Sequence, residues 1–84
     1  MKFNIIVARD ILTDSYLQPR FINIPVDAQF EAECRSLYRA PQDVLIKYRD
    51  LELYDLGVYD DKDCKFVLKV PVLVGRFAQL VEKL

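Results

Sequence analysis

The chain of 84 residues contains no histidine and only two glycines, Gly57 and Gly75. Without histidine, a nucleophilic serine or cysteine lacks the base that activates it in Ser-His and Cys-His pairs. Two glycines are too few for the glycine-rich loops that bind nucleotide phosphates. Acidic residues are numerous, but nothing in their spacing brings them together in a pocket. We therefore expect a protein that is not an enzyme, with no catalytic residues and no cofactor.

The chain also lacks an excess of either charge and a long hydrophobic run. Twelve basic and thirteen acidic side chains give a net charge of −1, so the field of the whole molecule does not draw it to phosphates or anionic lipid. No run approaches the roughly 18 apolar residues of a membrane-spanning helix, and the N-terminal residues do not follow the plan of a secretory signal. We expect a soluble, intracellular protein that has no membrane contact.

Metal-binding patterns are missing as well. Cys34 and Cys64 are the only cysteines and have no C-x-x-C spacing, so they indicate neither a disulfide framework nor a zinc site. Each falls on an apolar face of an expected element, and we expect both to be buried and reduced. Asp60, Asp61 and Asp63 lack the central glycine and closing glutamate of an EF-hand loop. A solvated turn, and no metal site, is the better interpretation.

What the chain does contain is a clear pattern of extended and helical segments. Residues 2–8 are apolar on both faces and predict a central strand. Residues 16–24 predict a second strand. Because Pro19 donates no hydrogen bond to a ladder, we expect this strand to be an edge strand or a bulged one. Asp27 is a suitable N-cap for an amphipathic helix of about three turns. The apolar stripe of that helix comprises Phe30, Cys34, Leu37 and Tyr38.

The second half of the chain repeats the order of strands followed by a helix. Pro41 predicts the start of a short helical turn, and residues 50–70 read as a hairpin. The second hairpin strand alternates, which predicts an inner face of Cys64, Phe66, Leu68 and Val70. In the first hairpin strand the apolar phase changes, so either a bulge near Gly57 shifts it or both faces are covered.

A C-terminal helix is predicted by the spacing of Phe77, Leu80, Val81 and Leu84. The expected architecture is a single domain over residues 1–84 of the α+β class. It has a small antiparallel sheet of about four strands in ββαββα order, packed with two helices.

Two short helices do not cover both faces of such a sheet, and an uncovered apolar face favours a partner. Tyrosine suits interfaces because its ring is apolar and its hydroxyl forms hydrogen bonds. The alternatives are a homodimer interface and a core that the same aromatics complete. The candidate interface residues are Phe21, Tyr54, Leu56, Val58 and Tyr59.

Exposed rings on a sheet also suit single-stranded nucleic acid, because bases stack on them. Basic side chains would then have to line a path for the phosphates. The acid-rich residues 50–63 oppose this by repelling phosphates nearby. The candidate nucleic-acid-binding residues are Tyr16, Arg20, Arg35, Arg39, Lys47 and Arg49.

A family resemblance adds to this interpretation. Residues 50–60 read DLELYDLGVYD, with Arg9-Asp10, Tyr16 and Pro19 upstream and Pro71-Val72 downstream. This pattern resembles the small non-structural protein of gokushovirus-type microviruses, which are phages with single-stranded DNA genomes. The chain departs from the family pattern at residues 38–50, where a more apolar stretch replaces a longer polar loop.

The resemblance implies a non-enzymatic accessory protein in the host cytoplasm that assists single-stranded DNA synthesis or genome packaging. Its partners would be single-stranded DNA, the viral replication protein or the assembling procapsid. It supplies no site residues. Two hypotheses therefore remain open, direct binding of single-stranded DNA and a homodimeric module that binds a viral or host protein. An acidic mimic of nucleic acid is a weaker third, because the charges balance.

Overall fold

The computed structural model describes residues 1–78, which form one antiparallel sheet and two helices. The expected α+β class with a small antiparallel sheet is confirmed. Its described elements run in the order βββααββ and not in the expected order ββαββα. The predicted second strand divides into two short ones around Pro19, and the short helical turn predicted at Pro41 is a second helix. The elements are β1 (Lys2–Asp10), β2 (Ser15–Tyr16), β3 (Arg20–Ile22), α1 (Val26–Leu37), α2 (Gln42–Tyr48), β4 (Leu51–Asp60) and β5 (Lys65–Arg76).

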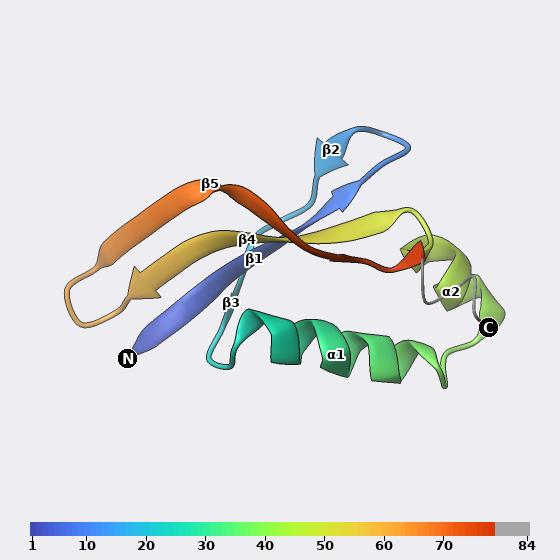
Figure 1. Ribbon diagram of the computed structural model, residues 1–84, viewed down its shortest axis with the longest axis horizontal. Coiled ribbons are helices and arrows are strands. Elements are labelled where there is room, and N and C mark those ends of the chain that lie inside the picture. The colour runs from blue at the N-terminus through green and yellow to red at the C-terminus, as the bar shows by residue number, and fades with distance from the viewer. Residues whose placement is uncertain (79–84) are drawn as a thin grey trace.

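The sheet has the order β2-β1-β4-β5. Strands β2 and β3 both pair with the same edge of β1, β2 at Arg9 and Asp10 and β3 at residues 4–6. The expected central position of β1 and the edge position of the segment around Pro19 are both confirmed. The sheet is long and strongly twisted, so β5 crosses over β4 and β1 in projection (Figure 1). The predicted C-terminal helix lies almost entirely outside the described residues.

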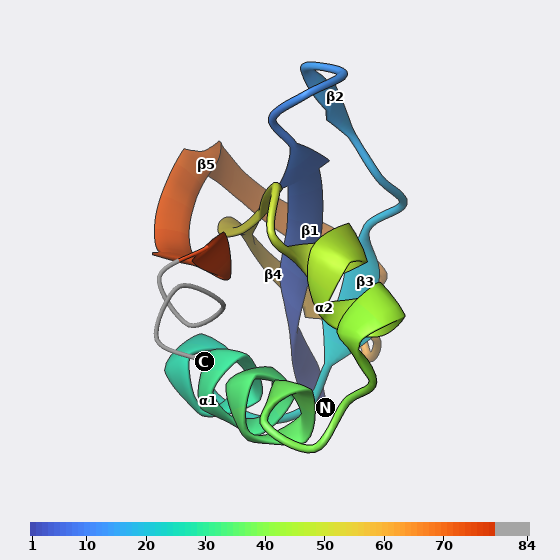
Figure 2. The same cartoon turned by 90° about the vertical axis from the view of Figure 1, so that its right-hand side faces the viewer.

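The two helices lie on one side of the sheet and enclose the main core (Figure 2). This core consists of Ile6, Leu37, Leu53 and Phe77, each at most 3% exposed. Phe30 of α1 and Tyr48 of α2 pack their rings against Phe77. Helix α2 begins directly after Pro41, where a short helical turn is predicted. Residues 1–78 contain no helix that is long and apolar enough to cross a membrane.

A β-bulge in β4 determines which side chains face the helices. The register with β1 shifts between Ile5 and Ile6, and the register with β5 shifts between Asp55 and Gly57. Since strand side chains alternate, the extra residue returns Val58 to the helix side with Leu53 and places Tyr59 on the opposite face with Tyr54. The bulge alternative predicted near Gly57 is therefore confirmed.

Two expectations about local structure, the N-cap at Asp27 and the burial of Cys64, are wrong. Pro25, with φ −57° and ψ 146°, occupies the N-cap of α1, so Asp27 lies inside the first turn and makes no capping hydrogen bond. Cys64 is exposed in the turn before β5, at φ +50°, and only Cys34 is half-buried.

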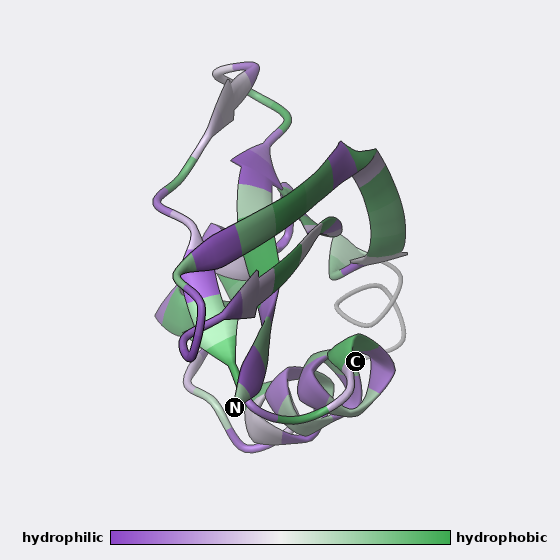
Figure 3. Ribbon diagram, turned by 90° about the vertical axis from the view of Figure 1, so that its left-hand side faces the viewer, coloured by the Kyte–Doolittle hydropathy of each residue, from purple (hydrophilic) through white to green (hydrophobic). Residues whose placement is uncertain are grey.

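The expected inner face of β5 is also exposed, because β5 is an edge strand and no described helix covers it. Its apolar residues give a nearly continuous hydrophobic band (Figure 3). Phe66 is 52% exposed, Leu68 66% and Val70 83%.

Candidate nucleic-acid interface

The sheet face opposite the helices carries a group of six rings, which we call the aromatic face. Strand alternation and the pairing register place them together, although they come from all five strands. Beneath them Ile5 and Val7 are buried, at 3% and 2% exposed, and neither belongs to the helix-side core. The rings of the aromatic face are Phe3, Tyr16, Phe21, Tyr54, Tyr59 and Phe66.

Four of these rings form one continuous cluster. Tyr59 lies between Phe21 and Phe66, with ring centroids 5.5 and 4.6 Å away, and Phe3 lies 6.4 Å from it. Such distances are typical of stabilising aromatic pairs. Phe21 and Phe66 remain half-exposed, so each ring packs on its neighbours and still presents surface to solvent.

The other two rings lie nearer the opposite end of the face. Tyr16 of β2 contacts Tyr54 of β4 edge to face, with centroids 5.9 Å apart. Tyr16 is 52% exposed, whereas Tyr54 is half-buried. Aromatic surface therefore extends along the whole sheet, because β1 connects the two groups.

A buried carboxylate organises this end of the face. Glu52 is 3% exposed and lies between Arg9 of β1 and Arg76 of β5. Its Oε1 accepts from Arg9 at 3.3 Å and from the Tyr54 hydroxyl at 3.1 Å, and its Oε2 lies 2.7 Å from Arg76 Nε. A carboxylate buried this deeply is stable only when paired, so the three partners fix its position.

The two arginines of this cluster differ in how far they reach solvent. Arg9 binds Asp14 in addition to Glu52, and the pKa of Arg9 is raised, first by its hydrogen bond to Asp14. The Arg76 side chain is 57% exposed and pairs with Glu52 through its Nε. The two arginines and the two carboxylates balance in charge, so the exposed part of Arg76 is what this cluster offers to a ligand.

The Tyr54 phenol gives a pH-dependent prediction. Its pKa is raised, first by loss of hydration and then by the hydrogen bond to Glu52. Because the folded pKa exceeds the unfolded value of about 10, this contribution to stability is complete below that pH and is lost as pH rises through the folded pKa. We expect Tyr54→Phe to remove a late component from the spectrophotometric titration of the tyrosines. Loss of the earliest component instead would contradict the assignment.

The structure separates the basic residues expected to bind nucleic acid. Tyr16 belongs to the aromatic face, but Arg20 points to the helix side, where it pairs with Glu33 at 2.7 Å. The remaining four are exposed on or just after the helices, and none of them joins the aromatic rings. They are Arg35 and Arg39, which line one shallow hollow at the end of α1, and Lys47 and Arg49 in and after α2.

The expected interface residues are only partly brought together. Phe21, Tyr54 and Tyr59 share the aromatic face, whereas Val58 lies on the helix side and Leu56 lies in the bulge. Sequence reasoning missed Phe3 and Phe66, which alternation along their strands indicated. It also missed the Arg9–Glu52–Arg76 cluster, and no sequence pattern marked it, since its members come from three separate strands.

In comparisons with known proteins, no family model, curated protein or solved structure matches the chain.

Proposed function

We propose that the protein binds single-stranded DNA on its aromatic face and acts as a non-enzymatic accessory factor in the genome synthesis or packaging of a small single-stranded DNA phage. The observation that carries this proposal is the row of rings on the uncovered sheet face, with Tyr16, Phe21 and Phe66 about half-exposed. Bases of any sequence stack on such rings. The resemblance of residues 50–60 to the microvirus non-structural protein supplies the biological setting.

Arg76 gives the proposed site one contact for a phosphate. Its side chain is 57% exposed and its Nε pairs with Glu52, whereas Arg9 is already paired with both Glu52 and Asp14. A phosphate bound by Arg76 lies at the end of the aromatic face that carries Tyr16 and Tyr54, because Tyr54 shares Glu52 with Arg76.

The binding experiment is fluorescence anisotropy with a labelled oligothymidine at several salt concentrations. One phosphate contact, at Arg76, predicts a slope of about −0.7 for the logarithm of affinity against the logarithm of salt concentration, since each phosphate on a single strand contributes about −0.7. A matched DNA duplex should bind less tightly because its bases are not free to stack. No binding of the single strand at low ionic strength would refute the proposal.

A second candidate function, a homodimeric interaction module, is favoured by β5. The outer backbone edge of this 12-residue strand pairs with no other strand of residues 1–78, and its exposed apolar residues include Val67, Leu68, Val70 and Val72. Such a strand pairs readily with another strand. A second copy related by a two-fold axis supplies an antiparallel β5 without further change, because the same surface is used on both chains.

The mass in solution tests this candidate. Light scattering is expected to give twice the chain mass of 9.9 kDa at high concentration, and Val70→Lys is expected to restore the single mass. Leu12→Lys is the matched control, because Leu12 is 75% exposed in the β1–β2 turn and away from β5. A wild-type protein that stays at 9.9 kDa at every concentration would exclude the dimer.

A further inference from the structure

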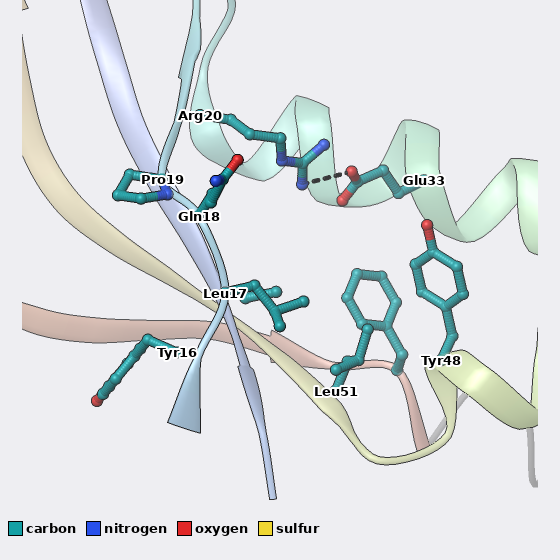
Figure 4. A pocket seen from close by; sticks show the side chains of 10 residues that line it. Tyr16, Leu17, Gln18, Pro19, Arg20, Glu33, Tyr48 and Leu51 are labelled. Carbon is teal, nitrogen blue, oxygen red and sulfur yellow. Dashed lines mark ion pairs between the residues drawn. The ribbon is translucent and has the colours of Figure 1, made fainter. Parts of the chain in front are cut away.

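A pocket of about 800 Å³ lies on the helix side of the sheet, next to the segment that carries Tyr16 of the aromatic face (Figure 4). Its walls come from residues 16–20, from α1 and α2, from the start of β4 and from Phe77. Segment 16–20 separates this pocket from the aromatic face: the Tyr16 ring points away from the pocket, while Leu17 points into it (Figure 4). A strand of DNA on the aromatic face thus passes close to the pocket at this edge of the sheet.

Most of the pocket wall is apolar, and it includes the aromatic rings of Phe77 and Tyr48. Leu17, Pro19, Leu51 and Phe77 line it, and the ring of Tyr48 closes the side nearest α2. This volume falls in the range of sites that enclose small organic ligands, and such walls suit a planar heterocycle. Apolar walls alone select no particular ligand, so the polar groups decide its identity.

The polar wall is an ion pair. One guanidinium nitrogen of Arg20 lies 2.7 Å from Glu33 Oε1. The other carboxylate oxygen, Glu33 Oε2, is buried and accepts no hydrogen bond from any residue in the described range 1–78. Because leaving a buried charged acceptor unpaired is costly, a ligand that donates to this oxygen gains binding energy from it.

When Glu33 Oε2 turns from its buried position toward the pocket, the ion pair offers three groups in order: a donor on Arg20, the acceptor Oε1 and the acceptor Oε2 of Glu33. The Watson–Crick edge of guanine offers the complementary order, with O6 as an acceptor and N1–H and N2–H as donors. The edge of cytosine repeats the order of the ion pair itself, while adenine and thymine each lack the second adjacent donor. Guanine alone satisfies all three groups.

We propose that this pocket binds a guanine base, with Glu33 accepting from N1–H and N2–H and Arg20 donating to O6. Glu33 turns its free oxygen toward the pocket to do so, and Leu17 and Phe77 pack against the base. The inference rests on the proposed function, because the guanine belongs to the DNA strand that stacks on the aromatic face. It adds a preference for one base to binding that is otherwise indifferent to sequence.

The test compares an oligothymidine with the same oligonucleotide carrying one central guanine. We expect about tenfold tighter binding of the guanine-containing strand, as for a good bidentate contact to a base. Glu33→Gln replaces one acceptor with a donor and is expected to abolish that preference while leaving the affinity for oligothymidine unchanged. Glu31→Gln, an exposed change on the same helix, is the matched control and should keep the preference.

A second measurement protects the test against misfolding of the Glu33 variant. The methyl signals of Leu17 and Leu51 in the wild-type protein are followed by NMR during titration with each of the four deoxynucleoside monophosphates. Deoxyguanosine monophosphate alone should shift them at low concentration, and equal shifts with all four would overturn the guanine site.

If oligothymidine binds but guanine adds nothing, the pocket inference fails and the proposed function stands. If neither strand binds, the proposed function fails, and the mononucleotides still decide the pocket.

Discussion

Replacing Gly57 with alanine is expected to lower the free energy of unfolding by about 3 kcal/mol. Gly57 has φ +128°, a conformation that residues with a Cβ rarely adopt, and a Cβ built there would lie 2.1 Å from the carbonyl oxygen of Val67. That oxygen belongs to the backbone of β5, so relieving the contact requires the two strands to move apart. Urea denaturation followed by circular dichroism measures the loss.

Gly75→Ala is the matched comparison for Gly57→Ala. A Cβ at Gly75 would lie 2.4 Å from the ring of Phe30, and the φ angle of Gly75 lies outside the left-handed region. A half-buried ring yields more easily than a backbone carbonyl, so we expect a smaller loss, about 1 to 2 kcal/mol. An equal or larger loss at Gly75 would show that the bulge does not govern the stability of the sheet.

The Gly57 prediction also bears on the aromatic face. The bulge allows Leu53 to join the helix-side core while Tyr59, six residues later on the same strand, joins the aromatic face. A β4 strand without the bulge would put Tyr59 on the helix side, because a shift of one residue exchanges the faces of a strand. The fold and the proposed site therefore depend on the same residue.

Replacing Phe21 with alanine is expected to weaken binding of oligothymidine about tenfold, since stacking on one aromatic ring contributes roughly 1–3 kcal/mol. Phe21 is 51% exposed, and it contacts Tyr59 and Phe66 at the centre of the ring cluster. The loss should therefore appear in DNA affinity more than in folding stability. Anisotropy titrations and urea denaturation of the same variant separate the two effects.

Tyr38→Ala is the control for Phe21→Ala. Tyr38 is 55% exposed, close to the exposure of Phe21, but it lies at the C-cap of α1 on the helix side. The account predicts unchanged DNA affinity for Tyr38→Ala. A loss as large as that of Phe21→Ala would indicate that any exposed ring contributes, and that the aromatic face has no special role.

The sequence predicted the parts of the fold that follow from local chemistry. Residues 2–8 are apolar at consecutive positions, which is typical of a strand with both faces in use, and β1 has this central position. Pro19 correctly predicted a segment at the edge of the sheet, although not its division into two strands, and the phase change around Gly57 correctly predicted a bulge. In each case the covalent geometry of one residue or a strict alternation limits the alternatives.

The parts that the sequence did not predict depend on contacts between distant segments. Alternation in residues 65–76 reveals two faces, but it does not tell how much of either face another element covers. In the structure α1 reaches only the end of β5 near Gly75. Glu52 is buried because Arg9, 43 residues away, and Arg76 both reach it. Likewise, charge counts could not show that Arg20 faces Glu33 while Arg35 and Arg39 lie at the end of α1.

Photocrosslinking tests the central claim, that bases stack on the aromatic face, most directly. An oligonucleotide containing bromodeoxyuridine is bound at low ionic strength and irradiated, and the attached residues are identified by mass spectrometry. The account predicts adducts on Tyr16, Phe21 or Phe66, the three rings with the most exposed surface on the face. Adducts confined to Tyr38 or to the two helices, or a protein that binds no single-stranded DNA, would contradict it.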